Sequence, residues 1–167
     1  MLEIRPAALS ELSQLPAIEA GADAAFGPGS TGICAADLPP AATVAEFAQA
    51  LHIMVAGRPP VGFARLEELD GAAHLEQLAV LPEWSGQGIG RALVEAAKAW
   101  ARESGYHTMT LTTFGEIAFN VPFYRSCGFT VLAELGPELA EVRAAEQRLG
   151  LDALGPRVAM GLDLNGA

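Results

Sequence analysis

Basic residues are scarce in this chain. Ten lysines and arginines stand against twenty aspartates and glutamates, so the formal net charge at pH 7 is −10. A protein that binds nucleic acid needs a basic face that displaces counterions from phosphates, and we therefore expect no nucleic-acid partner. An acidic balance favours a cationic small substrate, or it serves solubility alone.

Cysteine is also rare. The chain has two cysteines, Cys34 and Cys127, which lie far apart in the sequence. No Cys-x-x-Cys pair and no His-rich spacing occurs, which argues against a zinc site, so we expect no metal. We expect both cysteines to be reduced thiols that pack as small side chains in a cytoplasmic protein.

Long hydrophobic runs are missing as well. No run approaches the roughly 18 apolar residues that a membrane helix needs, and MLEIRPAALSELSQL lacks the charged-then-apolar layout of a signal peptide. We therefore expect no membrane partner and a cytoplasmic location. With 51% hydrophobic residues, the 167-residue chain can bury one sizeable core, so we expect a single domain over 1–167.

Hydrophobic periodicity predicts a mixed α/β chain with both meander and crossover connections. Ser10 is predicted to cap the first helix, and Thr43 with Glu46 has the spacing of a capping box. Asp70-Gly71 predicts a hairpin turn. The expected strands are 2–5, 52–56, 61–69, 73–81, 107–113, 129–135 and 157–164, and the expected helices are 11–20, 43–51, 88–104, 122–127 and 138–149.

The stretch WSGQGIGRALVEAAKAWARESG opens a long helix with three glycines in five residues. A glycine-rich turn between a strand and a helix is a typical anion site, because N–H groups point outward and the helix dipole adds about half a positive charge. Gly86, Gly88 and Gly90 would let phosphate oxygens approach the main chain. Arg91, in the first turn, could add a charge-assisted contact.

Three phosphate ligands compete for this loop. A Walker A loop ends in Gly-Lys-Ser/Thr, whereas Gly90 is followed by Arg91-Ala92. A Rossmann fingerprint has the spacing G-x-G-x-x-G in the first βαβ unit, whereas the spacing here is G-x-G-x-G and a meander precedes it. The diphosphate of coenzyme A remains, and the structural alternative is a tight turn that binds nothing.

Two longer motifs follow each other in the sequence. The first is LEQLAVLPEWSGQGIGRALVEAAKAWARESGY, and the second, TLTTFGEIAFNVPFYRSCGF, pairs Asn120 with F-Y-x-x-x-G-F at 123–129. In this order and separation they resemble the motifs of the GNAT superfamily of N-acetyltransferases over residues 61–132. The family pattern R/Q-x-x-G-x-G/A falls on Ser85 at its first position, which puts one charged contact in doubt.

The resemblance implies an α/β (mixed α+β) fold: a mostly antiparallel central sheet with one splayed parallel pair, flanked by helices. It also implies acetyl-CoA as co-substrate, with its diphosphate on the amides of the glycine loop. Pantetheine would lie along the strand 75–80 like an added strand. The residues expected to bind the cofactor are Leu78, Ala79, Val80, Ser85, Gly86, Gln87, Gly88, Ile89, Gly90, Arg91, Asn120, Phe123 and Tyr124.

Acetyl transfer to an amine needs a neutral amine, a polarised thioester carbonyl and a stabilised leaving thiolate. Glu76 is the candidate base, because it lies on an otherwise apolar strand where burial would raise its pKa. It shares a face of that strand with His74, Leu78 and Val80. The alternative is a structural glutamate or one that binds the substrate cation. His74 is a rival base, although a lone histidine on a strand is more often a packing residue.

Tyr124 is the candidate acid. The resemblance places its hydroxyl beside the sulfur of coenzyme A, and a phenol can donate a proton to a thiolate. The alternative is a packed aromatic residue with a hydrogen-bonded hydroxyl. Asn120 is expected to contact pantetheine or a phosphate, or to cap the following helix. Phe123 and Phe129 are expected to contribute to the core.

We therefore expect an enzyme that moves an acetyl group from acetyl-CoA to a primary amine of a small molecule or peptide, directly and in a ternary complex. The alternative is a non-catalytic acyl-CoA-binding sensor or interaction module. A homodimer through the final strands is compatible with the sequence. Substrate groups are expected on the first two helices, the loop 27–40, the turn 113–118 and the last hairpin, which include Asp23, Asp37, Glu46 and Glu116.

Overall fold

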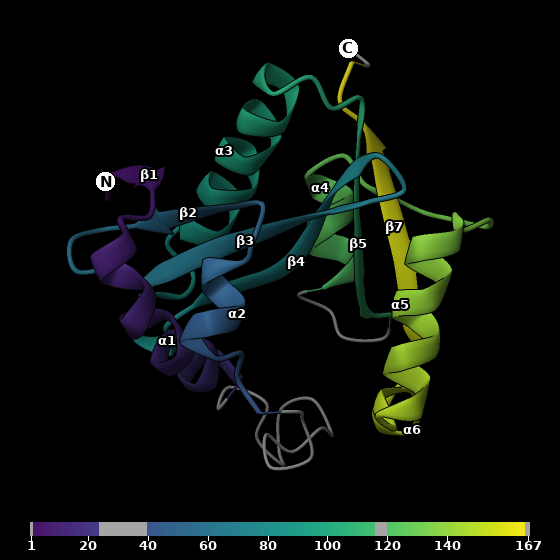
Figure 1. Cartoon of the computed structure of the whole chain (residues 1–167), viewed down its shortest axis with the longest axis horizontal. Coiled ribbons are helices and arrows are strands. Elements are labelled where there is room, and N and C mark those ends of the chain that lie inside the picture. The colour runs from purple at the N-terminus through teal and green to yellow at the C-terminus, as the bar shows by residue number, and fades with distance from the viewer. Residues whose placement is uncertain (1, 24–39, 116–119, 166–167) are drawn as a thin grey trace. The chain divides into compact units, whose positions relative to one another are not determined.

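The computed structural model describes residues 2–23, 40–115 and 120–165 (Figure 1). Cys34, Asp37, Glu116 and most of the loop 27–40 lie outside these ranges. The chain divides into two compact units, which are described separately. The first comprises Met1–Glu67 and Leu75–Trp100, and the second comprises Glu68–His74 and Ala101–Ala167.

Seven strands form one sheet in the order β1-β2-β3-β4-β5-β7-β6. Antiparallel pairing joins β1 to β2, β2 to β3, β5 to β7 and β6 to β7, whereas β4 and β5 are parallel through Ala73↔Met109 and His74↔Thr110. The mostly antiparallel sheet with one parallel pair is confirmed. The strands are β1 Ile4–Pro6, β2 His52–Ala56, β3 Gly62–Leu69, β4 Ala72–Val80, β5 Thr108–Phe114, β6 Thr130–Val131 and β7 Arg157–Asp163.

The first unit encloses an apolar core between its strands and its first helices. Phe47 and Phe63 meet edge to face, with ring centroids 5.2 Å apart. The first expected helix is in fact a 3₁₀ helix, η1 (Leu9–Gln14), that continues into α1 (Leu15–Asp23). The members of this core are Leu12, Leu15, Ile18, Phe47, Ile53, Val55, Phe63 and Ala79.

The two predicted helix starts in this unit have different outcomes. Ser10 is not the capping residue, because η1 begins after Ala8, whose N–H donates to the Glu11 carboxylate. Thr43 does cap α2 (Val44–Ala48) and forms the predicted capping box with Glu46. A capping box is read correctly from sequence because both of its partners lie within one turn.

The long helix α3 (Ile89–Glu103) begins and ends within one residue of the predicted bounds. Its apolar stripe is largely buried, as expected: Ile89, Leu93 and Ala97 are buried, while Trp100 is half-buried. Gly105 follows the helix with a φ of +91°, as expected for a glycine just after a helix. Within the described ranges, no helix combines the length and apolar character that a membrane span requires.

In the second unit, β5 and β7 pair along their whole length, and three helices accompany them: α4 (Val121–Ser126), α5 (Pro137–Arg148) and α6 (Leu151–Leu154). The expected strand 129–135 is reduced to the two residues of β6, because the chain turns into α5 at Gly136-Pro137. The helix α6 was not expected from sequence, since four residues are too short to show a helical period. Cys127 is buried, as predicted.

Candidate cofactor-binding and active site

The predicted phosphate loop lies between β4 and α3 in the first unit. Gly86 and Gly88 have φ angles of +77° and +82°, in the left-handed region that side chains rarely adopt. A Cβ atom at either position would meet nothing within 4 Å, and both residues are exposed. The two glycines are therefore required by the backbone conformation, and they leave open space above it.

The turn before these glycines uses Ser85 for its own stability. After the short 3₁₀ helix η3 (Pro82–Trp84), the Ser85 hydroxyl and the Ser85 N–H both donate to the Pro82 carbonyl, at 2.8 and 3.1 Å. This is the position at which the resemblance would place an arginine or glutamine. A short side chain turned back on its own loop keeps the space over Gly86 and Gly88 clear.

The start of α3 presents main-chain donors next to the open loop. Ala92 N–H donates to the Gly88 carbonyl at 3.0 Å, whereas N–H groups earlier in a helix have no partner within the helix itself. Those of Ile89 and Gly90 belong to this set, and the helix dipole reinforces their partial positive charge. The Ile89 side chain is buried and the Arg91 side chain is exposed, so this arrangement can hold an anion from the main chain.

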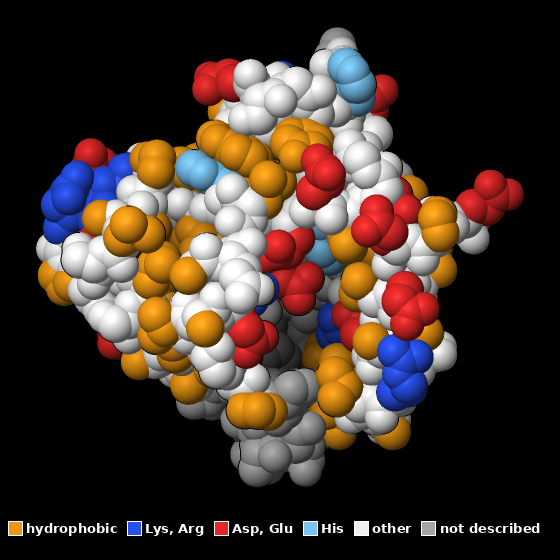
Figure 2. Space-filling model, in the orientation of Figure 1, with side chains coloured by type: hydrophobic (Ala, Val, Ile, Leu, Met, Phe, Trp, Pro, Cys, Tyr) orange, Lys and Arg blue, Asp and Glu red, His pale blue; other side chains and the backbone are white. Residues whose placement is uncertain are grey.

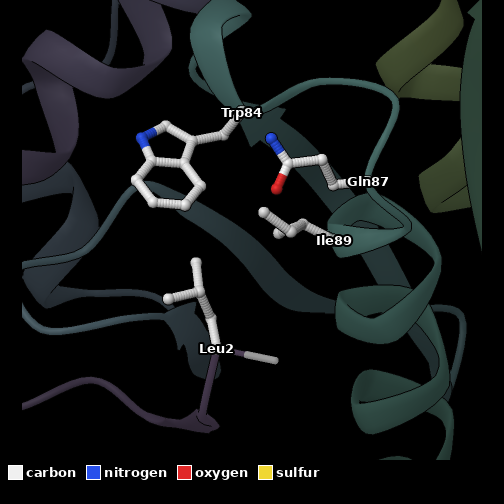
Figure 3. A pocket seen from close by; sticks show the side chains of 4 residues that line it. All are labelled: Leu2, Trp84, Gln87 and Ile89. Carbon is white, nitrogen blue, oxygen red and sulfur yellow. The ribbon is translucent and has the colours of Figure 1, made fainter.

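A small pocket of about 230 Å³ lies beside the loop and is lined by Leu2, Trp84, Gln87 and Ile89. Figure 3 shows the Trp84 indole and the Gln87 amide turned toward the same space, with Leu2 opposite. The pocket is smaller than the roughly 300–1,000 Å³ of typical ligand sites. No sequence pattern predicts Leu2 here, whereas Trp84 stands at the start of the glycine motif.

The predicted pantetheine strand is the last part of β4. Ala79 is buried, and Leu78 and Val80 are half-buried. Gly62 of β3 lies so close to this stretch that an added Cβ would stand 2.9 Å from the Ala79 carbonyl oxygen and 3.2 Å from the Val80 side chain. A side chain at residue 62 would therefore collide with this part of β4.

Glu76, on the same strand, is exposed. The expected burial of its carboxylate is therefore wrong, because period-two alternation identifies the face of a strand but not how deeply that face is covered. His74 is 1% exposed, and burial lowers its pKa to about 4. Its Nδ1 shares a hydrogen bond with the Thr110 hydroxyl at 2.8 Å. A neutral, enclosed imidazole agrees with the packing interpretation of His74.

The second motif builds an aromatic cluster around α4 in the second unit. The Tyr124 ring meets Phe123 and Phe129 edge to face, with centroids 5.1 and 5.9 Å apart. Phe129 is buried as expected, while Phe123 and Tyr124 are half-buried. The low-polarity surroundings raise the pKa of Tyr124, with the neighbouring Cys127 thiol adding to the effect. The phenol is therefore protonated at neutral pH.

Asn120 stands at the start of α4. Its main-chain carbonyl accepts from Tyr124 N–H at 2.9 Å, but its side chain makes no capping hydrogen bond. The capping interpretation of the side chain is thus wrong. The first unit holds Glu76, residues 78–80 and residues 85–91, and the second holds Asn120, Phe123 and Tyr124.

A charged cluster in the second unit was not predicted. The Glu146 carboxylate of α5 accepts hydrogen bonds from the Thr112 hydroxyl at 2.6 Å, from Arg143 at 2.7 Å and from Arg157 at 3.2 Å. Arg157 also lies over the Phe114 ring, 4.5 Å from its centroid. Only the i,i+3 spacing of Arg143 and Glu146 could have been noticed in the sequence. Acidic side chains are the commoner charged type on the face shown in Figure 2.

The chain is similar in sequence to a curated protein, similar in fold to solved structures, and matched by a family model. An aminoglycoside N(6′)-acetyltransferase type 1 from Stenotrophomonas maltophilia is 36% identical over 78 residues, covering 41% of this chain and 51% of the relative. This chain thus spans about half the length of that curated relative.

Among solved structures, the ribosomal-protein-S18-alanine N-acetyltransferase from Escherichia coli matches with a TM-score of 0.69 and 20% identity, over 100% of this chain and 96% of that chain. The PaiA N-acetyltransferase from Thermoplasma acidophilum, in complex with coenzyme A, matches with a TM-score of 0.68 and 16% identity, over 98% and 99%. At such identities these structures establish the fold. The family model described as acetyltransferase (GNAT) family matches residues 32–129, more than half of the chain, and the chain therefore belongs to the GNAT family of acetyltransferases.

Proposed function

We propose that the protein is an acetyl-CoA-dependent N-acetyltransferase that acts on a primary amine of a small molecule. The observation that carries this proposal is the exposed glycine loop at the start of α3, where Gly86 and Gly88 adopt left-handed conformations over open space. Family membership supplies the chemistry for which such a loop is suited. The transfer takes place directly from thioester to amine in a ternary complex.

The cofactor is held mainly by main-chain groups. The N–H groups of Gln87–Arg91 bind the diphosphate, because a helix start concentrates donors and partial positive charge without a counter-anion of its own. Main-chain groups of Leu78–Val80 bond the pantetheine amides, and one N–H there polarises the acetyl carbonyl. Asn120 and Phe123 contact the pantetheine arm.

Glu76 acts as the general base. An exposed carboxylate is suited to receive the amine's proton through a water molecule, and this route does not need the burial that was expected. Replacing Glu76 by Gln should lower kcat/KM about tenfold or more at neutral pH. Acetyl-CoA affinity should stay the same, which separates loss of a base from loss of the cofactor site.

Tyr124 acts as the general acid toward the leaving thiolate. Its raised pKa keeps the phenol protonated, which is the form that can donate. The acceptor is a small cationic amine, in keeping with the net charge of −10 and with the curated relative named for aminoglycosides. The ammonium form binds first and must lose its proton before it attacks the thioester.

The test is a panel of primary amines incubated with acetyl-CoA, with release of free coenzyme A followed by a thiol reagent. The panel should include an aminoglycoside, a polyamine, an amino acid and a peptide with a free N-terminus. Release that depends on one of these amines, with mass spectrometry showing the acetylated amine, is the expected result. Acetyl-CoA binding by calorimetry without release from any amine would instead favour the sensor interpretation.

A further inference from the structure

The start of α5 is capped by a residue that is far away in the sequence. The N-cap residue is Gly136, which has no side chain to offer. The Asp70 carboxylate takes its place and accepts from Glu138 N–H and Leu139 N–H, both at 2.9 Å. The Glu138 carboxylate in turn accepts from Asp70 N–H at 2.8 Å. Together these bonds form a reciprocal capping box between residues 68 positions apart.

The capping geometry is complete and tight. Pro137 has no N–H, the next two donors go to Asp70, and Ala140 N–H donates to the Gly136 carbonyl at 2.9 Å. An added Cβ at Gly136 would lie 2.5 Å from the Asp70 carboxylate. Gly136 is therefore needed because of this close approach, since its φ of −66° would suit any residue.

The Asp70 carboxylate is held in place by the turn between β3 and β4. Asp70 has a φ of +53° and Gly71 a φ of +75°, the conformation of a tight two-residue hairpin turn. Figure 1 shows this turn close to the beginning of α5. A non-glycine residue in the left-handed region is uncommon, and here its side chain has a defined partner.

Among the described residues of α5, Leu139 is buried, and Val142, Ala144 and Ala145 are half-buried. Two turns after Leu139, Glu146 bonds Thr112 and Arg157, and Arg143 bonds Asp152 of α6 at 3.0 Å. The contacts that hold α5 in place thus include the buried leucine, the cap from Asp70 and the Glu146 cluster. Losing one anchor from such a helix should loosen the whole element rather than its first turn alone.

We propose that the β3–β4 turn is a latch for α5, in which Asp70 caps the helix from outside and positions it over the Thr110–Thr112 face of β5. His74 bonds Thr110 on this face, and Glu146 of α5 accepts from Thr112. The latch therefore fixes α5 on the face of β5 that carries Thr110 and Thr112.

Two substitutions open the latch by different routes. Asp70→Gly removes the carboxylate and keeps a residue that accepts the positive φ. Gly136→Ala removes no group and places a methyl against the carboxylate. The matched control is Glu141→Gln, an exposed change on the same helix.

The measurement is hydrogen exchange of the α5 amides in the full chain. Each of the two variants should speed exchange from Leu139 to Arg148 about tenfold, the loss expected for an N-cap. The control should change nothing. The double variant should be no faster than Asp70→Gly alone, because the methyl then has no carboxylate to displace. Faster exchange confined to Glu138 and Leu139, or additive effects in the double variant, would overturn the latch.

Discussion

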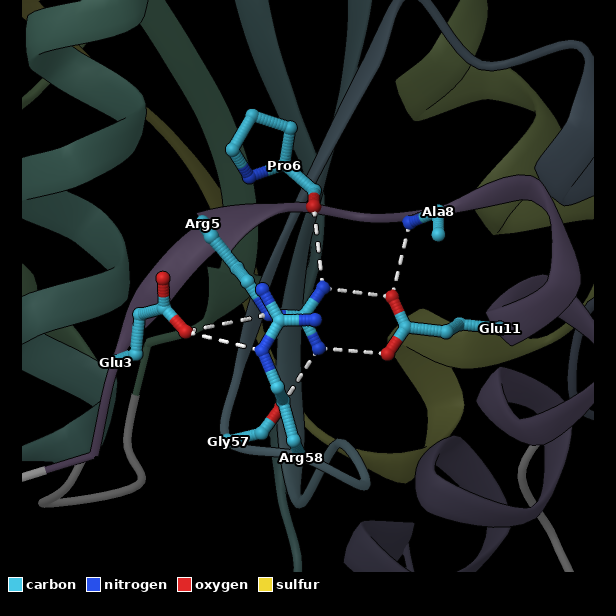
Figure 4. A network of polar contacts seen from close by, with 7 residues as sticks. All are labelled: Glu3, Arg5, Pro6, Ala8, Glu11, Gly57 and Arg58. Atoms are coloured by element: carbon cyan, nitrogen blue, oxygen red, sulfur yellow. Dashed lines mark hydrogen bonds and ion pairs between the residues drawn. The ribbon is translucent and has the colours of Figure 1, made fainter.

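Two regions of the first unit solve the problem of satisfying polar groups in opposite ways. At the start of α3, Gly86 and Gly88 leave open space over the main chain. Around Arg5, by contrast, charged side chains bind one another and main-chain carbonyls of the protein. The Arg5 guanidinium holds both oxygens of Glu11 at 2.7 and 2.6 Å and the Gly57 carbonyl at 2.9 Å (Figure 4).

In this unit the proposed cofactor site consists mainly of main-chain groups, whereas the charged side chains around Arg5 bind one another. Arg5 is 8% exposed and lies in a network in which Glu11 also accepts from Ala8 N–H, so its charge is used to join β1 to η1. Glu3 and Arg58 extend the network to the surface as an exposed pair at 3.1 Å. The start of α3, with its glycines, is instead the place where we propose that the diphosphate binds.

The largest expected effect comes from Gly88→Val. A valine there cannot adopt a φ of +82° without strain and would fill the space that glycine leaves open. Affinity for coenzyme A, measured by calorimetry, should fall at least a hundredfold. Gly105→Val is the matched control, since Gly105 also has a positive φ and open space, but at the other end of α3. An equal loss in both variants would show that strain, and not the site, is responsible.

The second largest effect is expected from Tyr124, whose side chain is proposed to act in the reaction and not in binding the cofactor. Tyr124→Phe should lower kcat about a hundredfold, as expected for loss of a general acid, and leave acetyl-CoA affinity nearly unchanged. Tyr106→Phe is the control, because that hydroxyl donates to Glu68 at 2.6 Å and has no role in the proposed reaction. Equal losses of binding and turnover in Tyr124→Phe would argue against the acid role.

The pH dependence of kcat gives an independent view of the same residue. The raised pKa of Tyr124 keeps the phenol protonated as the pH rises, so its ionisation should not lower kcat anywhere below about pH 10. The ratio of the kcat of wild type to the kcat of Tyr124→Phe should therefore stay constant between pH 7 and 10. If this kcat ratio falls toward one within this range, Tyr124 is not the general acid.

For the Arg5 network the expected effect is on stability alone. Glu11→Gln should lower the free energy of unfolding by about 2 kcal/mol at pH 7, because hydrogen bonds to charged groups are lost. The bidentate contact with Arg5 lowers the pKa of Glu11 from 4.5 to about 2. Its contribution is thus fully present above pH 4.5 and lost as the pH falls toward 2.

Urea denaturation at several pH values tests this prediction. The difference between wild type and Glu11→Gln should shrink as the pH is lowered from 5 toward 2. Glu3→Gln, in an exposed pair, should cost little at any pH. Coenzyme A affinity should be unchanged in both variants. A large loss of coenzyme A affinity in Glu11→Gln would contradict the view that the Arg5 network serves stability alone.

The smallest effect on stability is expected at the start of α2, where Thr43 and Glu46 form a capping box. Thr43 accepts from Glu46 N–H at 3.2 Å, and the Glu46 carboxylate accepts from Thr43 N–H at 3.2 Å. Thr43→Ala should therefore cost about 1 kcal/mol of stability. Thermal unfolding is the measurement, with Thr43→Ser as the control that retains the cap. Stability equal to wild type in Thr43→Ala would mean that the capping box contributes nothing.

Local signals explain most of what could be predicted from sequence. The Thr43–Glu46 box, the Asp70-Gly71 turn and the start of α3 each depend on residues within a few positions of one another, and each was placed correctly. The parallel pairing of β4 with β5 agrees with the strand–helix–strand order around the glycine loop, which favours a parallel crossover.

Long-range contacts explain what was missed. The Asp70 cap of α5 and the Glu146–Arg157 bonds join residues that are distant in sequence. Hydrophobic periodicity describes single helices and strands and cannot predict such contacts. The burial of Glu76 was misjudged because alternation along a strand says nothing about what covers its faces. The glycines of the proposed phosphate loop are recognisable in the sequence because three of them occur in five residues before a helix, whereas Arg5 looks like any charged residue near a strand.

The most direct test of the central claim is a crystal structure of the protein grown with coenzyme A. The account predicts diphosphate oxygens within about 2.7–3.2 Å of main-chain nitrogens between Gln87 and Arg91. It would be contradicted by a cofactor bound elsewhere, or by a diphosphate held only by arginine side chains while these nitrogens face solvent.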